Sequence, residues 1–247
     1  MQRSAPICRR KEAADPERQA DMSLFLDVNA TCRRCATKTG FRLAASVNAD
    51  RRPDLRQSIL DGTFQSETCP GCGAALRLPM HLSYLDIGRG QWILAEDVEK
   101  LPEWRDVEVE AQDVFDATYG KDAPRAAQEI GAVLRPRLVL GWPALRETLI
   151  TDELVLDPVV IELLKIVILR RVPDSPLADT TELRLVGEAD GALEFAWLEG
   201  ASENMLAGLP IGRDAYDAIA ADREHFSGIS RDLEGHLFLD FRRMILA

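Results

Sequence analysis

Between Ser23 and about Ala95, apolar and polar residues alternate over short runs that end in turn-forming residues. This alternation is typical of half-buried strands. We therefore predict strands on either side of two cysteine pairs, followed by a hairpin: Ser23–Val28, Gly40–Val47, Phe64–Thr68, Ala75–Leu78, His81–Asp86 and Gln91–Ala95. A short helix is predicted between the cysteine pairs, because Pro53 suits a first helical position and Gly62 suits the residue after a helix end.

From Leu101 to Arg171 the apolar residues recur every three or four positions, which indicates helices. The predicted elements are the helices Val109–Thr118, Pro124–Leu134, Ala144–Asp152 and Val159–Arg171, with a short apolar strand or linker at Arg137–Leu140. Glu162 and Lys165 interrupt the last, mostly apolar helix. Charged residues three apart pair readily on a helix surface, so we interpret Glu162 and Lys165 as a solvated stripe of this helix. We interpret Arg146 and Glu147 as ordinary residues of a helix surface.

After a proline-rich linker at Pro173–Asp179, the pattern predicts a hairpin of Glu182–Gly187 and Ala192–Leu198, a helix at Ile211–Phe226 and a final strand at His236–Arg242. The predicted fold class is therefore α+β. It comprises a four-cysteine zinc-ribbon-like N-terminal unit with an inserted helix, a helical middle region and a small C-terminal hairpin–helix–strand unit. The predicted boundaries are a disordered extension at 1–21, a domain at 22–172 and a smaller unit at 180–247.

Charge is spread unevenly along the 247 residues, whose net charge is −11. Residues 1–100 hold 15 Lys/Arg and 13 Asp/Glu, a balance of +2. Residues 101–247 hold 15 Lys/Arg and 28 Asp/Glu, a balance of −13. An acidic half repels phosphate backbones, so nucleic acid would have to bind the N-terminal part. The first residues lack the apolar stretch of a signal peptide, and the longest apolar run, Val159–Leu169, is too short to span a bilayer. We expect a cytoplasmic protein without membrane contact.

Four of the five cysteines form two C-x-x-C pairs, Cys32/Cys35 and Cys69/Cys72, separated by 33 residues. Two such pairs can place four thiolates around one Zn²⁺ ion at about 2.3 Å, which closes its tetrahedral shell. Two alternatives remain open at this point, a coincidence of buried cysteines and a thioredoxin-like redox pair. The spacing favours a structural Zn²⁺ site, and Cys8 receives no role.

Basic residues stand beside the first pair, where Arg33 and Arg34 separate the two cysteines. Four thiolates and one Zn²⁺ carry a formal charge of −2, so these arginines can simply offset it. An alternative interpretation is that they join Arg51 and Arg52 in contacting phosphate or a partner. This second interpretation predicts a nucleic-acid-binding surface in the N-terminal part.

Several segments resemble the CpXC family, which is named for two Cys-Pro-x-Cys motifs. They are the knuckle Cys69–Gly73, the helix between Leu55 and Gly62, the strand Leu82–Asp86, and the segments Arg137–Gly141, Leu145–Glu147 and Ile161–Lys165. The resemblance covers roughly Leu24–Leu169. This chain departs from the family pattern at Arg33, where proline is expected, but it keeps all four ligand positions. The resemblance implies a fold and a metal, and it supplies no substrate.

The sequence contains no phosphate-binding glycine loop, and none of its three histidines lies in a known nucleophile or metalloprotease motif. We predict no catalytic residue. The favoured function is a non-enzymatic, Zn²⁺-stabilised interaction or adaptor protein with a protein partner that the sequence does not name. Alternatives are a nucleic-acid-binding zinc ribbon and a thiol-redox-responsive zinc switch. Apolar residues near the C-terminus, including Phe238 and Phe241, also make self-association possible.

Overall fold

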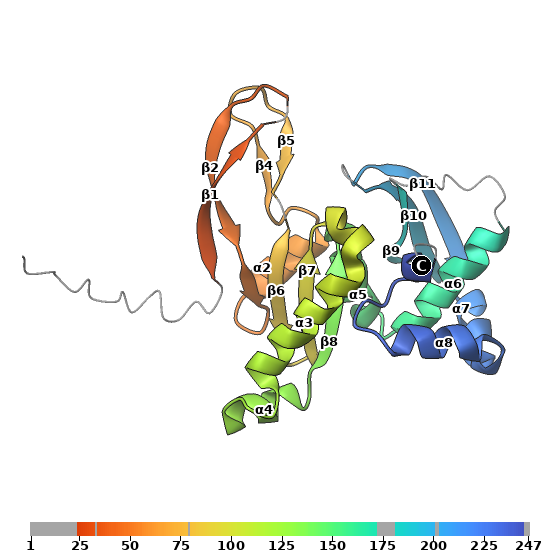
Figure 1. The fold of residues 1–247 in the computed structure, drawn as a ribbon. Coiled ribbons are helices and arrows are strands. Elements are labelled where there is room, and N and C mark those ends of the chain that lie inside the picture. Colours follow the sequence, from red (N-terminus) through yellow and green to blue (C-terminus); the bar gives the residue numbers. More distant parts are fainter. Residues whose placement is uncertain (1–23, 33, 79, 172–180, 201–202, 245–247) are drawn as a thin grey trace, which may run out of the picture.

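The computed structural model describes residues 24–32, 34–78, 80–171, 181–200 and 203–244 (Figure 1). The predicted extension at 1–21 and the predicted linker at Pro173–Asp179 lie outside these ranges. Within them the chain is a mixture of helices and several separate sheets. The predicted α+β class is confirmed.

Two β-hairpins carry the cysteine pairs and stand out from the body of the molecule (Figure 1). The first consists of β1 (Phe25–Thr31) and β2 (Lys38–Ala44), and the second of β4 (Ser66–Thr68) and β5 (Ala75–Arg77). The predicted helix between them is α2 (Pro53–Leu60), with Gly62 at a φ of +71° just after its end. Because glycine adopts positive φ without a steric penalty, it can reverse the chain at this point.

A four-stranded mixed sheet forms the centre of the molecule, in the order β3-β6-β7-β8. Its strands are β3 (Ser46–Asn48), β6 (His81–Asp86), β7 (Gln91–Glu96) and β8 (Arg135–Leu140). Strands β6 and β7 form the predicted hairpin, and β8 lies parallel to β7. Every residue of β7 is buried, because helices cover both faces of the sheet.

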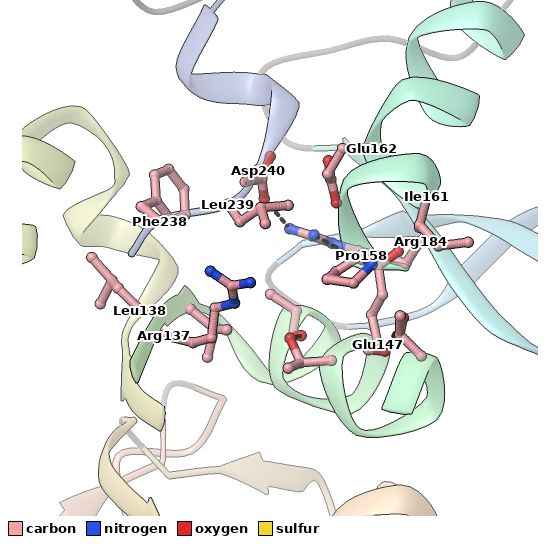
Figure 2. Close-up of a pocket in the computed structure, with 14 residues that line it drawn as sticks. Arg137, Leu138, Glu147, Pro158, Ile161, Glu162, Arg184, Phe238, Leu239 and Asp240 are labelled. Carbon is pink, nitrogen blue, oxygen red and sulfur yellow. Dashed lines mark hydrogen bonds and ion pairs between the residues drawn. The ribbon is translucent and has the colours of Figure 1, made fainter. Parts of the chain in front are cut away.

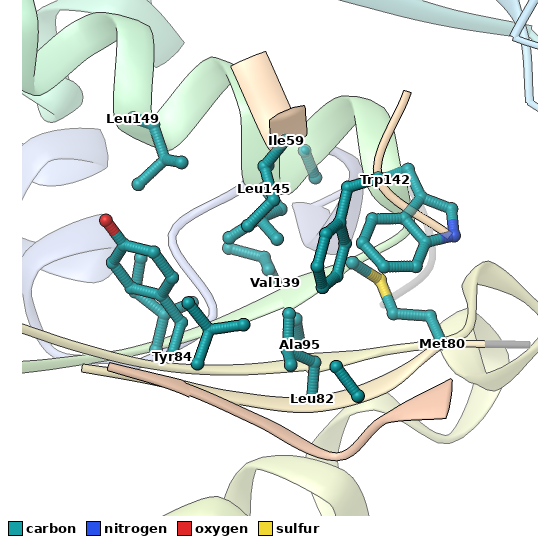
Figure 3. Packing of buried hydrophobic residues seen from close by; sticks show 14 of the residues in the cluster. Ile59, Met80, Leu82, Tyr84, Ala95, Val139, Trp142, Leu145 and Leu149 are labelled. Carbon is teal, nitrogen blue, oxygen red and sulfur yellow. The ribbon is translucent and has the colours of Figure 1, made fainter. Parts of the chain in front are cut away.

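One face of this sheet packs against α2 and α5 (Trp142–Glu153). Figure 3 shows Leu82, Tyr84 and Ala95 of the sheet meeting Leu145 and Leu149 of α5. The other face packs against α3 (Trp104–Tyr119), which follows a 3-10 helix at Val98–Glu103 and precedes α4 (Arg125–Gly131). Helix α3 begins five residues before the predicted start at Val109, so its core residues Trp104 and Val107 lie outside the predicted helix, and Val109 itself is exposed.

The C-terminal part forms a second core around a three-stranded antiparallel sheet, in the order β11-β10-β9. Its elements are β9 (Thr181–Ala189), β10 (Ala192–Glu199), β11 (Met205–Gly212), α7 (Arg213–Ala221), a 3-10 helix at Arg223–Phe226, α8 (Ser227–Glu234) and a 3-10 helix at Phe241–Met244. Helix α6 (Pro158–Arg171) packs into this core with its apolar side chains. The predicted hairpin is confirmed as β9 and β10.

Two predictions in this part are wrong. The helix predicted at Ile211–Phe226 starts only at Arg213, because Ile211 and Gly212 end the additional strand β11. The strand predicted at His236–Arg242 is reduced to a single parallel bridge between Phe238 and Leu138. Side chains take the place of a strand partner here, since Glu108 accepts from the Phe238 amide and Glu162 from the Phe241 amide.

The interpretation of Glu162 and Lys165 as a solvated stripe is also wrong. Lys165 is fully buried and Glu162 is 4% exposed, because α6 is surrounded by protein on all sides. Glu147 of α5, expected at an ordinary helix surface, is likewise buried, and it accepts from Lys165 Nζ at 2.9 Å. These residues form an ionic cluster inside the protein. Among the described residues, no helix has the length and apolar character needed to cross a bilayer.

Candidate metal centre

The two cysteine pairs lie in the turns of the two protruding hairpins. Cys32 and Cys35 follow β1, whose last register pair is Thr31 with Lys38. Cys69 and Cys72 follow β4, in which Thr68 pairs with Ala75. Each hairpin ladder therefore holds its cysteine pair at the end where the strands turn, and the two turns meet.

The backbone of the two turns is nearly the same. In the first, Ala36 N donates to Cys32 O at 2.8 Å, and Cys32 N donates to Thr37 O at 2.9 Å. In the second, Gly73 N donates to Cys69 O at 2.9 Å, and Cys69 N donates to Ala74 O at 2.8 Å. Residues Ala36 and Gly73 occupy equivalent positions with φ values of +57° and +70°. The two turns therefore share these backbone hydrogen bonds and the left-handed residue that follows the second cysteine.

The four sulfur atoms converge on one point. All four Sγ atoms lie within 4.8 Å of one another. Cys32 Sγ lies 3.7 Å from Cys72 Sγ, and Cys35 Sγ lies 3.5 Å from Cys69 Sγ. A tetrahedral ion bound at about 2.3 Å would separate its sulfur ligands by about 3.8 Å. The cluster therefore has the size of a four-thiolate metal site.

Close packing between the turns depends on the absence of a side chain at Gly71. A Cβ atom at this position would overlap Thr37 Oγ1 and come within 3.3 Å of Cys35 Sγ. A hydrogen bond of 3.2 Å joins Thr37 Oγ1 to the same sulfur. Thr37 is a supporting residue that sequence reasoning missed. Its signal is its position two residues after a C-x-x-C pair, where a short hydroxyl side chain can reach back to the second sulfur.

The surroundings of the thiols change their pKa values in opposite directions. Hydrogen bonding from the Thr37 side chain, and then from its backbone, lowers the pKa of Cys35 to about 6. Backbone amides at Cys35 and Arg34 lower the pKa of Cys32. The Ala74 amide favours the thiolate of Cys72, but the neighbouring Cys35 and then burial outweigh it and raise the pKa to about 11. Without a cation the four thiols do not all ionise, whereas a bound divalent ion would stabilise four thiolates together.

The four arginines near the cysteine pairs differ in their surroundings. Arg34 and Arg51 are exposed, whereas Arg33 lies outside the described residues. Arg52 is paired with Asp54 at 2.7 Å, so a carboxylate already offsets its charge. A nucleic-acid contact through these four arginines stays a prediction.

His81, the histidine nearest to the cysteines in sequence, has another role. It starts strand β6, and its Nδ1 lies 2.6 Å from Glu96 Oε1. Among the described residues, only the four cysteines form a group of His, Cys, Asp or Glu ligand atoms with metal-site spacing. The ligand set predicted from the spacing is thus the set that the fold brings together.

The fold and this site define an α+β protein whose paired cysteine turns meet in one four-thiol cluster. The sequence model of the CpXC family, described as CpXC protein, matches residues 30–165. This match covers more than half of the chain, so the protein belongs to the CpXC family. Searches of curated proteins and of solved structures give no significant match.

Proposed function

We propose that the four cysteines bind a structural Zn²⁺ ion and that the protein acts as a non-enzymatic interaction or adaptor protein. The convergence of four Sγ atoms within 4.8 Å carries the proposal. Four thiolates would fill the coordination shell of Zn²⁺ and leave no open position for a substrate or an activated water. In this proposal the metal joins two hairpins in a zinc-ribbon-like arrangement.

An interaction role is supported by the surface of the first hairpin. Leu24 and Leu26, at its start, are 57% and 46% exposed. Large apolar side chains that remain exposed near each other often mark a contact surface for another protein. A metal that fixes the two hairpins would hold such a surface in one shape, which lowers the entropy cost of binding.

Metal analysis of the purified full chain tests the first half of this proposal. We expect one Zn²⁺ per chain, lost in Cys69→Ser but retained in Cys8→Ser, the matched control because Cys8 belongs to neither C-x-x-C pair in the sequence. Affinity capture with the Zn²⁺-loaded protein and with Cys69→Ser tests the second half. A partner retained by the loaded protein alone supports an adaptor. A turnover activity abolished by changing one carboxylate or histidine outside the ligand set would contradict it.

A thiol-redox switch is a second candidate, because the four sulfurs differ in accessibility. Cys35 is exposed, whereas Cys32 and Cys69 are almost fully buried. Oxidants reach exposed thiolates first, so Cys35 would be the entry point for oxidation and metal release. Release of Zn²⁺ under mild peroxide, followed with a chromogenic chelator, is the expected result. Retention of the metal under these conditions would exclude the switch.

A further inference from the structure

The charged side chains that the fold buries beside a cavity of about 40 Å³ bond one another. Figure 2 shows the guanidinium of Arg184 directed at Asp240 in this cavity, where their charged atoms lie 2.9 Å apart. Arg184 also binds Glu147 at 2.8 Å, and all three side chains are almost fully buried. Because these groups are both paired and shielded from solvent, they serve packing and do not meet an external reagent. The cysteine cluster differs, since one of its sulfur atoms is accessible.

Cys35 is the cysteine of the cluster that reaches the surface. It is exposed, Cys72 is half-buried, and Cys32 and Cys69 are 2% and 1% exposed. Cys35 and Cys72 occupy equivalent positions, because each is the second cysteine of its turn and the two turns share their backbone hydrogen bonds. Their unequal exposure therefore comes from what surrounds each turn. A reagent from solution meets Cys35 first.

The residue two positions after the second cysteine also distinguishes the two turns. It is Thr37 in the first turn and Ala74 in the second, and in both turns its backbone amide hydrogen-bonds the sulfur of the second cysteine. Thr37 adds its side chain, with Oγ1 3.2 Å from Cys35 Sγ. A metal-bound sulfur is a thiolate and can only accept, so the hydroxyl is then the donor. Cys35 therefore receives one hydrogen bond more from this position than Cys72 does.

The opposite turn holds this hydroxyl in place. Gly71 lies against Thr37, and a Cβ atom at Gly71 would overlap Thr37 Oγ1. The hydroxyl is thus confined between Gly71 and the sulfur of Cys35, which restricts the rotamers that the β-branched side chain can adopt. Packing between the two turns therefore keeps the hydroxyl beside the exposed sulfur.

We propose that Cys35 is the reactive ligand of the metal site, the one that small electrophiles attack, and that the Thr37 hydroxyl slows this reaction. A hydrogen bond draws negative charge from a thiolate and makes its sulfur a weaker nucleophile. Thr37 is then a positioning residue that acts through Cys35. The inference rests on the proposed Zn²⁺ site, and it names the residue that would control a thiol-redox switch there.

Alkylation of the Zn²⁺-loaded full chain with iodoacetamide tests the inference. The Cys35 thiolate forms a sulfur–carbon bond and iodide leaves with the bonding electron pair, so no proton is transferred. The product is an uncharged thioether, so the site loses a thiolate ligand and releases Zn²⁺. A chromogenic chelator follows this release, and peptide mass spectrometry identifies the alkylated cysteine. Every variant also carries Cys8→Ser, because a further thiol would consume the reagent.

Cys35 should be the first cysteine of the cluster to be alkylated. Thr37→Val and Thr37→Ala should react about three- to tenfold faster than the parent, because a hydrogen bond to a charged group no longer stabilises the thiolate. Thr37→Ser keeps a hydroxyl and should react as the parent does. Thr68→Ala is the matched control and should not change the rate, because the structure shows no hydrogen bond from exposed Thr68 to the four described sulfurs.

Thr37→Val separates the hydrogen bond from simple shielding, because valine is as large as threonine. The proposal is overturned if Thr37→Val reacts as the parent does, since shielding alone would then explain any effect of Thr37→Ala. First alkylation at Cys32, Cys69 or Cys72 also overturns it. So does loss of Zn²⁺ from both variants before any reagent is added, which would make Thr37 a structural residue. A parent that holds no Zn²⁺ would contradict the proposed function together with this inference.

Discussion

At the scale of single residues, the two cysteine turns share a backbone but differ at one strained position. Ala36 and Gly73 both adopt left-handed backbone conformations, and only glycine does so without a steric penalty. We predict that Gly73→Ala lowers the stability of the Zn²⁺-loaded protein by about 1 kcal/mol, and that Ala36→Gly changes it little or raises it slightly. Thermal and urea unfolding of the two variants measure this difference.

A glycine without positive φ provides the control. A Cβ atom added at Gly187 in β9 would meet open space, as it would at Gly73, but the backbone of Gly187 is not left-handed. Gly187→Ala should therefore not destabilise the protein, because alanine suits a strand better than glycine does. An equal loss of stability in Gly187→Ala and Gly73→Ala would show that backbone conformation is not the cause.

The contact between the two turns gives a second prediction at this scale. Gly71→Ala should weaken Zn²⁺ binding, because its new Cβ would overlap Thr37 Oγ1 beside Cys35. Thr37→Ala removes that oxygen and leaves the threonine Cβ at 3.1 Å. The double variant should therefore bind Zn²⁺ more tightly than the product of the two single effects predicts. Competition with a metal chelator measures the affinities, and purely additive losses would contradict the proposed overlap.

At the scale of elements, an ionic cluster joins α5, α6, β9 and the C-terminal segment. Arg184 of β9 donates to Glu147, Glu182 and Asp240, and Lys165 of α6 bridges Glu147 and Glu162. Removing one member of a buried ion pair leaves an uncompensated charge and costs about 3–5 kcal/mol. These contacts therefore fix how the four elements pack, whatever their net contribution to stability.

Glu162 makes this cluster sensitive to pH. Burial is the main cause that raises its pKa to about 7, and the nearby carboxylates of Asp240 and Glu147 raise the pKa further. The cations Lys165 and Arg184 lower the pKa but do not offset these effects. A carboxyl whose pKa is raised on folding stabilises the protein below its unfolded pKa of about 4.5, and this stability is lost as pH rises toward about 7. We predict that wild type loses stability relative to Glu162→Gln across this window, by up to about 1.4 kcal/mol per pH unit.

Urea unfolding of both proteins at several pH values measures this difference. Glu129→Gln serves as the control, because Glu129 forms an exposed pair with Arg125, and exposed pairs contribute little to stability. Its stability relative to wild type should not change with pH across the window. A constant difference between wild type and Glu162→Gln would show that the carboxyl is ionised throughout.

The sequence predicted the elements whose signals are local. The hairpin β6–β7 follows from alternation around a glycine turn, and α2 follows from Pro53 and Gly62. Strand β11 was missed because its glycines and proline suppress the strand signal. The segment from His236 has the alternation of a strand, but Glu108 and Glu162, distant in sequence, bond its amides.

Whether a site could be predicted likewise depends on whether its signal is local in the sequence. Cysteine spacing predicted the four-thiol cluster, because each pair is a local motif and two pairs complete one shell. The ionic cluster was not predicted, since its members lie on four elements and each looks like a surface charge in its own segment.

At the scale of the whole molecule, α6 connects the family region to the rest of the chain. The family match ends at residue 165, inside α6, yet the apolar side chains of this helix pack with β9, β10 and α7. We predict that a chain of residues 1–171 does not fold cooperatively, because it exposes α6 and leaves Glu147 without Arg184. Dye binding to exposed apolar surface and NMR dispersion test this. A sharp thermal transition would favour an independent domain that ends near residue 172.

Removal of the metal should affect the molecule unevenly. The cysteine turns lie at the tips of hairpins, whereas β6 and β7 are held by an apolar core with α2 and α5 that contains none of the cysteines. Because a structural Zn²⁺ contributes its binding energy to the parts that it joins, chelation should loosen β1–β2 and β4–β5 and leave the central sheet folded.

Amide hydrogen exchange measures this prediction directly. In the Zn²⁺-loaded protein we expect protection at both hairpins to fall about a hundredfold or more after chelation, with little change at Leu82, Tyr84 or Ile93 in the central sheet. Cys8→Ser should respond as wild type does, and Cys69→Ser should resemble the chelated protein before any chelator is added. If exchange instead accelerates equally in the hairpins and the central sheet, the metal supports the whole fold, and the apolar core does not hold the sheet alone.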